Sequence, residues 1–327
     1  MSKTEALTLT PLLPGIYVIQ GTTNVGVITN IKSSKKTGPV IQIYLVDAGR
    51  TEEQGLAVLQ AVNSFFEKQP LPFCIKAIIN THAQSDHCGA DAIIQQKTGC
   101  QIYLSVYERG TLENPYIQAG ILWGGFPPKE LQNSLYMPAI VQKTRLIDFN
   151  KKLHFTAPDN SRFTVSFLEL PGHYFGDTGV LISTKEKKLL FAGDAISNRR
   201  ELGKYWIQFM IQPQKFIETL QKICAIKKLE YCVPSHGKII KEDLAETAEL
   251  CTIAIYSTRQ SILNALKGGS LSTEQLIKEV ARQHNISMGL GQYNLVSATI
   301  RSHLSSLREN KQIKMKVIEN QVFWENI

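Results

Sequence analysis

Two histidines and an aspartate, His82, Asp86 and His87, lie close together in the stretch IINTHAQSDHCGAD, residues 78–91. Imidazole and carboxylate groups are the ligands that zinc, iron and manganese take in proteins. The cluster ends the apolar run CIKAIINTH, which predicts a short buried strand. A strand fixes the backbone while the side chains that follow it project past the sheet. The stretch therefore predicts a metal-binding loop.

Three further ligand-type residues stand in the same kind of place later in the chain. His173 follows FTVSFLELPG, Asp194 follows LLFAG and His236 follows YCVPS, each just past a predicted strand and beside a glycine. Six such residues at successive strand ends predict one metal centre rather than scattered hydrogen-bonding groups. The remaining histidines lack this setting and are predicted to be ordinary surface or core residues: His154, His284 and His303.

The elements that must hold these residues are strands first, and then alternating strands and helices. Residues 15–49 contain the β-rich runs GIYVIQ, NVGVITNI and PVIQIYLVDAG. A helix is predicted over residues 51–69 from its apolar spacing, and a shorter one over 90–99 that ends at Gly99. Strands resume between residues 146 and 195, and a last short strand precedes His236. This order predicts an α+β domain.

Residues 106–140 interrupt the alternation with a segment rich in glycine, proline and aromatic residues. We interpret it as a partly helical insertion, because a long connection of this kind is often a lid or a binding loop. Trp123 and Phe126 are its candidate substrate-binding residues. The alternative is a structural patch, or a contact between two copies of the chain in a homodimer.

From about residue 241 the pattern changes to helices. STEQLIKEVARQH opens with a capping box of Ser272 and Gln275, and NLVSATIRSHLSSLREN predicts a second helix. IKMKVIENQVFWE then predicts a hairpin that turns at Glu319 and Asn320. Helix, helix and hairpin form the outline of a winged helix. We therefore divide the chain into a first domain, residues 1–245, and a small winged-helix-like domain, residues 246–327.

The C-terminal region is basic. Residues 251–327 carry nine Lys/Arg and five Asp/Glu, a net charge of +4 within the chain's total of +8. Lys314 and Lys316 on the predicted wing, with Arg301 and Arg308 on the last helix, could contact the phosphates of a nucleic acid. The alternative is a module that packs against the first domain or makes a dimer, since a fold alone does not establish nucleic-acid binding.

The metal-binding pattern resembles the metallo-β-lactamase superfamily over roughly residues 14–240. The resemblance rests on five motifs: LVDAG at Asp47, HAQSDH against the family's H-x-H-x-D-H, PGH at His173, AGD at Asp194 and PSHG at His236. It implies an αββα sandwich with two metal ions at one edge of the sheets. By position, the first ion would be held by His82, Gln84 and His173, and the second by Asp86, His87 and His236, with Asp194 bridging the two.

This chain departs from the family pattern at Gln84, which stands where a histidine is usual. A glutamine carbonyl can bind a metal, but it is neutral and harder than imidazole, and so a poorer partner for zinc. Tyr174 and Ser235 also replace a small hydroxyl residue and a glycine. The ligand set of the second ion is intact, so we expect one or two divalent ions. Zinc is the expected metal, with iron or manganese as alternatives.

The sequence also indicates the cellular location that we expect for the protein. Neither a secretory leader nor a run approaching the ~20 apolar residues of a membrane span is visible. Six cysteines are scattered without paired spacing, which fits reduced thiols better than disulfides. We expect a cytoplasmic protein that does not enter a membrane.

These observations predict a metal-dependent hydrolase that uses metal-bound hydroxide on a small ester, thioester or lactone. Asp86 and Asp194 are the candidate catalytic residues, because Asp86 would help to orient the water and Asp194 would bridge the ions. Cys88 is expected to be a small buried residue rather than a redox group. Two alternatives stay open: an RNA or DNA nuclease, favoured by the basic C-terminal region, and a regulatory binding protein with a degraded metal site, favoured by Gln84.

Overall fold

The computed structural model describes residues 7–34, 38–141, 143–204 and 206–327. Within these residues, the first sheet has seven strands that lie in sequence order. They are β1 (Leu9–Leu13), β2 (Ile16–Ile19), β3 (Val25–Ser34), β4 (Gly38–Val46), β5 (Phe73–Ile79), β6 (Gln101–Leu104) and β7 (Thr144–Leu146). Strands β1 to β4 pair antiparallel, whereas β4 to β7 pair parallel. Parallel neighbours need a crossover, and helices supply it after β4, β5 and β6.

The second sheet, again within the described residues, has five strands in the order β12-β11-β10-β9-β8. Its strands are β8 (Leu153–Thr156), β9 (Arg162–Glu169), β10 (Thr178–Ser183), β11 (Lys188–Gly193) and β12 (Leu229–Pro234). Strands β8 to β11 are antiparallel. Strand β12 is parallel to β11 and is reached through α6 (Arg199–Lys204) and α7 (Pro213–Cys224).

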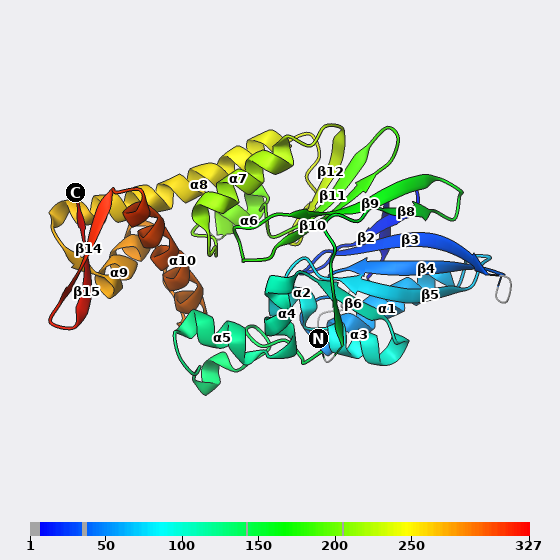
Figure 1. The fold of residues 1–327 in the computed structure, drawn as a ribbon, viewed down its shortest axis with the longest axis horizontal. Helices are drawn as coiled ribbons and strands as arrows, with labels where there is room; N and C mark the ends of the chain where they lie inside the picture. Colours follow the sequence, from blue (N-terminus) through cyan, green and yellow to red (C-terminus); the bar gives the residue numbers. More distant parts are fainter. Residues whose placement is uncertain (1–6, 35–37, 142, 205) are drawn as a thin grey trace.

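The two sheets pack face to face, with helices on both outer faces (Figure 1). In β10, the side chains of Val180 and Ile182 join the core between the sheets, and Leu181 joins the core beneath α7 and α8 (Leu244–Ala265). On the other side, α1 (Glu52–Phe66) and α3 (Asp91–Thr98) cover the first sheet. Alternate strand residues therefore feed two different cores, as the period of two requires. The predicted αββα sandwich is confirmed.

The strands that carry the candidate ligands end at the same edge of the sandwich. Asp47 follows β4 and the segment 80–88 follows β5, which is parallel to β4. Asp194 follows β11 and His236 follows the parallel strand β12. Strand β9 is antiparallel to β10, which is antiparallel to β11, so His173 also emerges at this edge. A short helix, α2 (Ser85–Cys88), continues the segment after β5.

The insertion contains α4 (Val106–Glu113), α5 (Tyr116–Trp123) and the 3-10 turn η1 (Lys129–Leu131). The C-terminal region contains α8, the 3-10 turn η2 (Leu266–Gly268), α9 (Thr273–Gln283), α10 (Leu290–Glu309) and a small sheet of β13 (Leu271–Ser272), β14 (Ile313–Ile318) and β15 (Gln321–Asn326). The predicted capping box of Ser272 and Gln275 is present, and Glu319 and Asn320 both have positive φ in the hairpin turn. Helix, helix and hairpin follow in the predicted order.

Helix α8 joins the two parts of the chain. Ala248 and Cys251 pack in the core beneath the second sheet, whereas Ile262 packs with α9 and α10. The division predicted after residue 245 falls inside this continuous helix. Among the described residues, no helix is both long and apolar enough to cross a membrane.

Candidate metal centre

The loop after β5 is built around the carboxylate of Asp47. Asp47 has a φ of 60° at the end of β4, and its side chain is buried. Its Oδ1 accepts a hydrogen bond from the Thr81 backbone N–H at 2.8 Å, and its Oδ2 accepts one from Thr81 Oγ1 at 2.9 Å. These bonds fix the backbone beside His82. Asp47 therefore positions ligands instead of pointing into the site.

The same carboxylate orients His87. Asp47 Oδ2 lies 3.0 Å from His87 Nδ1, so Nδ1 carries the proton and Nε2 is left to face the site. His236 is held in the same way, because its Nδ1 lies 2.7 Å from the carbonyl oxygen of Thr22. Asn198 donates to the His236 carbonyl at 2.8 Å and fixes the backbone of that loop. Both imidazoles thus present Nε2, the tautomer a metal ligand needs.

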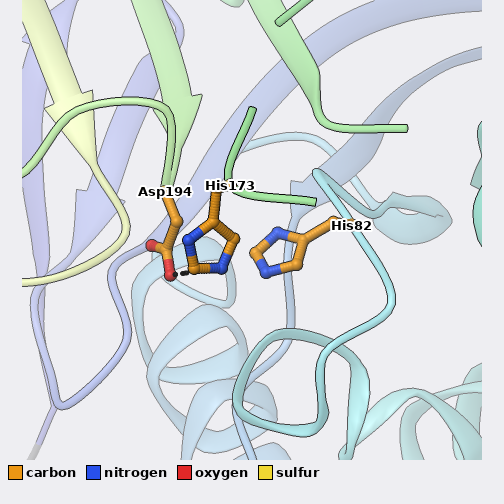
Figure 2. Close-up of side chains that lie close together, drawn as sticks. All are labelled: His82, His173 and Asp194. Atoms are coloured by element: carbon orange, nitrogen blue, oxygen red, sulfur yellow. Dashed lines mark ion pairs between the residues drawn. The ribbon is translucent and has the colours of Figure 1, made fainter. Parts of the chain in front are cut away.

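The first group of ligand-type side chains consists of His82, His173 and Asp194 (Figure 2). They come from three different strand ends and point toward one another. Gln84 completes the group, since its Oε1 lies 3.1 Å from His82 Nε2 and 2.8 Å from His173 Nε2. We call the space between these three donor atoms the first metal position, since it is the candidate site for one ion.

The second group consists of Asp86, His87 and His236, and the space between them is the second metal position. His236 Nε2 lies 3.2 Å from Asp86 Oδ2. Asp194 stands between the two groups: its Oδ2 is 3.5 Å from both His87 Nε2 and His173 Nε2, and its Oδ1 is 3.6 Å from His236 Nε2. The structure thus brings all seven predicted ligand residues together.

The donor spacing fits metal coordination. Zinc bonds of about 2.0–2.2 Å separate the donors of a tetrahedral site by roughly 3.3–3.5 Å. The separations around Asp194, 3.5–3.6 Å, fall near this range, whereas Gln84 Oε1 lies closer, at 2.8 Å and 3.1 Å, to its two imidazole nitrogens. His87 Nε2 is fully buried and lies 3.5 Å and 3.8 Å from the nearest carboxylate oxygens, which is longer than a good hydrogen bond. A buried nitrogen without a close partner, facing two carboxylates, is explained by a cation between them.

The charges lead to the same conclusion. Burial lowers the pKa of His82 well below its ordinary value, and His87 and His173 lower it further. For His236, burial lowers the pKa, but Asp194 and Asp86 outweigh burial and raise it to about 12. The carboxylates of Asp86 and Asp194 are therefore balanced by imidazole protons when no metal is bound. A divalent ion would supply that positive charge instead and release the protons.

A further carboxylate, Glu108 of α4, ties the two ligand loops together. It is fully buried; its Oε2 accepts from the Ala83 N–H at 3.0 Å and its Oε1 from the Gly176 N–H at 2.9 Å. Ala83 lies between His82 and Gln84, and Gly176 is three residues after His173. Burial raises the pKa of Glu108 to about 7. Sequence reasoning missed this residue, because nothing in the sequence around it signals burial.

A scan against protein-family models matches residues 41–236 to the metallo-beta-lactamase superfamily. The chain belongs to the metallo-beta-lactamase superfamily. Members of this superfamily are hydrolases, so the expected metallo-β-lactamase-fold hydrolase is confirmed. A search of curated proteins returned no match.

Solved structures show the same fold. A metallo-beta-lactamase family protein from Thermus thermophilus superposes with a TM-score of 0.69 and 17% identity, covering 97% of this chain and 100% of that one. A beta-lactamase domain protein from Burkholderia ambifaria gives 0.71 and 13%, covering 100% and 98%. A B3 metallo-beta-lactamase described as the first with an active-site glutamic acid gives 0.51 and 16%, covering 86% and 94%. The first two likenesses extend well beyond residues 41–236.

The two residues predicted to bind substrate lie on the insertion and are exposed. Trp123 ends α5 and is 43% exposed, and Phe126 is 76% exposed and stacks on Tyr116. Neither has a ring contact or hydrogen bond to a ligand residue among those described. An aromatic residue that sequence reasoning missed, Phe209, contacts His173 directly, with ring centroids 5.2 Å apart.

Cys88 is buried, as expected, and burial raises its thiol pKa well above the ordinary value.

Proposed function

We propose that this protein hydrolyses a small ester, thioester or lactone with one or two zinc ions, held by His82, Gln84 and His173 and by Asp86, His87 and His236. The observation that carries the proposal is the placement of Asp194 between two groups of three donors in one largely buried space. A bound divalent ion lowers the pKa of its water from about 15.7 to roughly 7, which makes hydroxide available at neutral pH.

The chain's own residues then have separate tasks. Asp86 is 21% exposed and Asp194 15% exposed, so their carboxylates can meet both a ligand water and the substrate. His87 and His173 stay buried, and the bond of His87 Nδ1 to the Asp47 carboxylate fixes the His87 ring. No serine or cysteine nucleophile is required. The nearest thiol, Cys88, is a poor nucleophile because its raised pKa keeps it protonated.

The two alternative functions, a nuclease and a binding protein with a degraded site, require different features of the molecule. A nuclease would use the basic C-terminal region, but Lys316 is paired with Glu325 at 2.7 Å and Arg301 with Glu274 at 2.9 Å. These pairs reduce the positive field available to phosphates, and so favour a small substrate. A binding protein with a degraded site would not need the complete second ligand group.

Metal removal tests the proposal. The zinc-loaded protein and the chelator-dialysed protein would each be assayed with p-nitrophenyl acetate, an acyl thioester, a simple lactone and labelled single-stranded RNA. We expect chelator-sensitive turnover of at least one of the first three, restored by zinc. Chelator-sensitive RNA cleavage without ester, thioester or lactone turnover would support the nuclease. Failure to retain metal would support the binding protein.

Removing a ligand provides a matched test at the site. His87→Ala or Asp194→Ala should lower turnover by at least about 100-fold, because even changes outside the ligand set alter metal affinity or activity 10- to 100-fold. The control is His154→Ala, which removes an exposed imidazole whose recorded contact is with Thr164. Turnover, metal content and circular dichroism would be measured together. Unchanged turnover in a folded His87→Ala variant would exclude the metal mechanism.

We keep the cytoplasm as the proposed location. All six cysteines are unpaired, and four of them are buried: Cys88, Cys100, Cys232 and Cys251. Free thiols of this kind suit a reducing compartment.

A further inference from the structure

An aromatic side chain packs against one ligand of the first metal position. The ring of Phe209 meets the ring of His173 edge to face, with centroids 5.2 Å apart and an interplanar angle of 84°. Phe209 is only half-buried, whereas His173 is buried. Tyr174 adds a second contact to the Phe209 ring, at 6.3 Å between centroids. A half-exposed phenyl ring beside a buried ligand imidazole offers apolar surface to whatever binds there.

The segment that carries Phe209 is held from two sides. On one side, the backbone N–H of Ile211 donates to the carbonyl oxygens of Gly172 and His173, both at 3.1 Å. On the other, the Thr299 hydroxyl of α10 accepts from the Met210 N–H at 3.1 Å, and its single proton is shared between the Gln208 and Leu295 carbonyls, both at 3.2 Å. Thr299 is buried, so these bonds are shielded from water. Phe209 lies between Gln208 and Met210, the two residues of this segment that Thr299 binds.

Helix α10 and the insertion also pack around this segment. A small apolar cluster, which we call the junction cluster, is formed by residues of α5, of the stretch that follows it, of the Phe209 segment and of α10. Its members are Ala119, Leu122, Leu131, Tyr136, Met137, Phe209, Ile211, Leu295 and Ala298. The Tyr136 hydroxyl also donates to the Gly291 carbonyl at 2.6 Å. The C-terminal region therefore contacts the element that borders the metal centre.

We infer that Phe209 is a specificity-determining residue that favours an apolar acyl or alkyl group beside the first metal position, and that α10 places it there through Thr299. The inference rests on the proposed function and names the substrate side of the same site. It gives the C-terminal region a task within the hydrolase that requires no nucleic acid. Because the ring and its tether lie on different parts of the chain, each can be altered without changing a metal ligand.

The test measures the preference for a short or a long acyl chain in two ways. The first measures binding of acetohydroxamic and octanohydroxamic acids to the zinc-loaded protein by calorimetry. The second measures kcat/KM for p-nitrophenyl acetate and octanoate. Wild type should prefer the longer chain in both. Phe209→Ala should reduce that preference by about 10-fold or more, the scale at which apolar pockets discriminate. Phe209→Leu should keep most of it, and metal content should stay the same.

The tether is tested by Thr299→Val, which keeps the shape and removes the hydroxyl's hydrogen bonds to Met210 and Gln208, together with its bond to Leu295 within α10. We expect a several-fold loss of the chain-length preference with unchanged metal content. Thr258→Val is the matched control, since within the described residues this buried hydroxyl bonds only to the Ala254 carbonyl of its own helix α8. Equal effects of the two variants would remove α10 from the inference.

The outcomes separate this inference from the proposed function. If no ester is hydrolysed but hydroxamate binding still depends on chain length and on Phe209, the proposed substrate class is wrong. The role of Phe209 in binding an apolar chain is then still supported. If esters are hydrolysed but Phe209→Ala keeps the wild-type preference for the longer chain, Phe209 does not determine specificity. The proposed hydrolase function is then still supported. A wild type that binds both hydroxamates equally, or neither, overturns the inference.

Discussion

Gln84 makes the two metal positions unequal. Its Oε1 lies close to His82 Nε2 and His173 Nε2, so it occupies the corner where the family pattern has a third imidazole. The second position has two imidazoles and a carboxylate, and shares Asp194. A neutral amide oxygen binds zinc less well than an imidazole nitrogen does. The first position should therefore be the weaker of the two.

Replacing Gln84 by histidine should raise the zinc content toward two ions per chain. The loss of an imidazole from the ligand set should matter at least as much as changes outside it, which alter affinity roughly 10- to 100-fold. The measurement is metal content by mass spectrometry after dialysis against a weak chelator, for wild type, Gln84→His and Gln84→Ala. Two ions in all three proteins would show that residue 84 is irrelevant to metal binding.

At the residue scale, the sequence was informative wherever a ligand follows a strand. All seven predicted ligands come together because their strands end at one edge. Most of the residues that orient these ligands could not be predicted from the sequence. The Thr22 carbonyl and Glu108 act through backbone groups that lie far away in the chain, and no local pattern marks such a contact. Phe209 was missed for the same reason.

Among the elements, α4 has the clearest structural task, because Glu108 bonds to both ligand loops. Its pKa is about 7 in the folded protein and 4.5 in an unfolded chain. The folded state therefore holds the proton more tightly. The contribution of this group to stability is fully present below pH 4.5 and falls as pH rises to 7, by up to roughly 3 kcal/mol.

The variant Glu108→Gln should lose that pH dependence. In chelator, the free energy of unfolding of wild type relative to the variant should fall between pH 4.5 and 7 and stay level above pH 7. Asp177, whose pKa burial and Glu108 raise well above the ordinary value, titrates in the same direction in both proteins. Denaturant unfolding at several pH values would measure the difference. A constant difference would show that the pKa of Glu108 is the same in the folded and unfolded states.

The insertion holds the next element-scale question. Helix α5 packs against α10 on one side (Figure 1). Trp123 and Phe126 remain exposed. If the segment closes over substrate, replacing both aromatics by alanine should raise KM or lower kcat while metal content stays constant. Steady-state kinetics and light scattering would be run together. Wild-type kinetics with a changed oligomeric state would assign these aromatics to a contact between two copies.

Element order was easier to predict than element bounds. The helix that ends at Gly99 was clear, because that residue has the positive φ of 69° that glycine adopts readily. Helices α2 and α6 were not predicted, since four and six residues are too few to show a helical period. The domain division was placed at a change of pattern, whereas α8 runs through it. A helix that packs in two cores gives no signal at the point where one core ends.

For the whole molecule, the distribution of charge separates the small-substrate hydrolase from the nuclease. The C-terminal hairpin carries Lys314 and Lys316, both exposed, and Lys316 is paired with Glu325. The contacts of α10 toward the metal centre run through Thr299 and the junction cluster, which do not include the hairpin. A charge change on the hairpin should therefore not reach the site through packing.

Replacing both Lys314 and Lys316 by glutamate should leave small-ester turnover within about two-fold of wild type. Exposed ion pairs contribute little to stability, so the fold should survive the loss of the pair with Glu325.

Each lysine that contacts a phosphate contributes about one unit to the salt dependence of nucleic-acid binding. A nuclease would therefore lose RNA binding, with a smaller salt slope, together with its activity. Ester turnover and RNA binding at 50 and 200 mM salt would be measured on the same preparations. Parallel loss of both would reassign the C-terminal region to nucleic-acid recognition, whereas intact turnover with no salt-dependent RNA binding in either protein supports the small-substrate hydrolase.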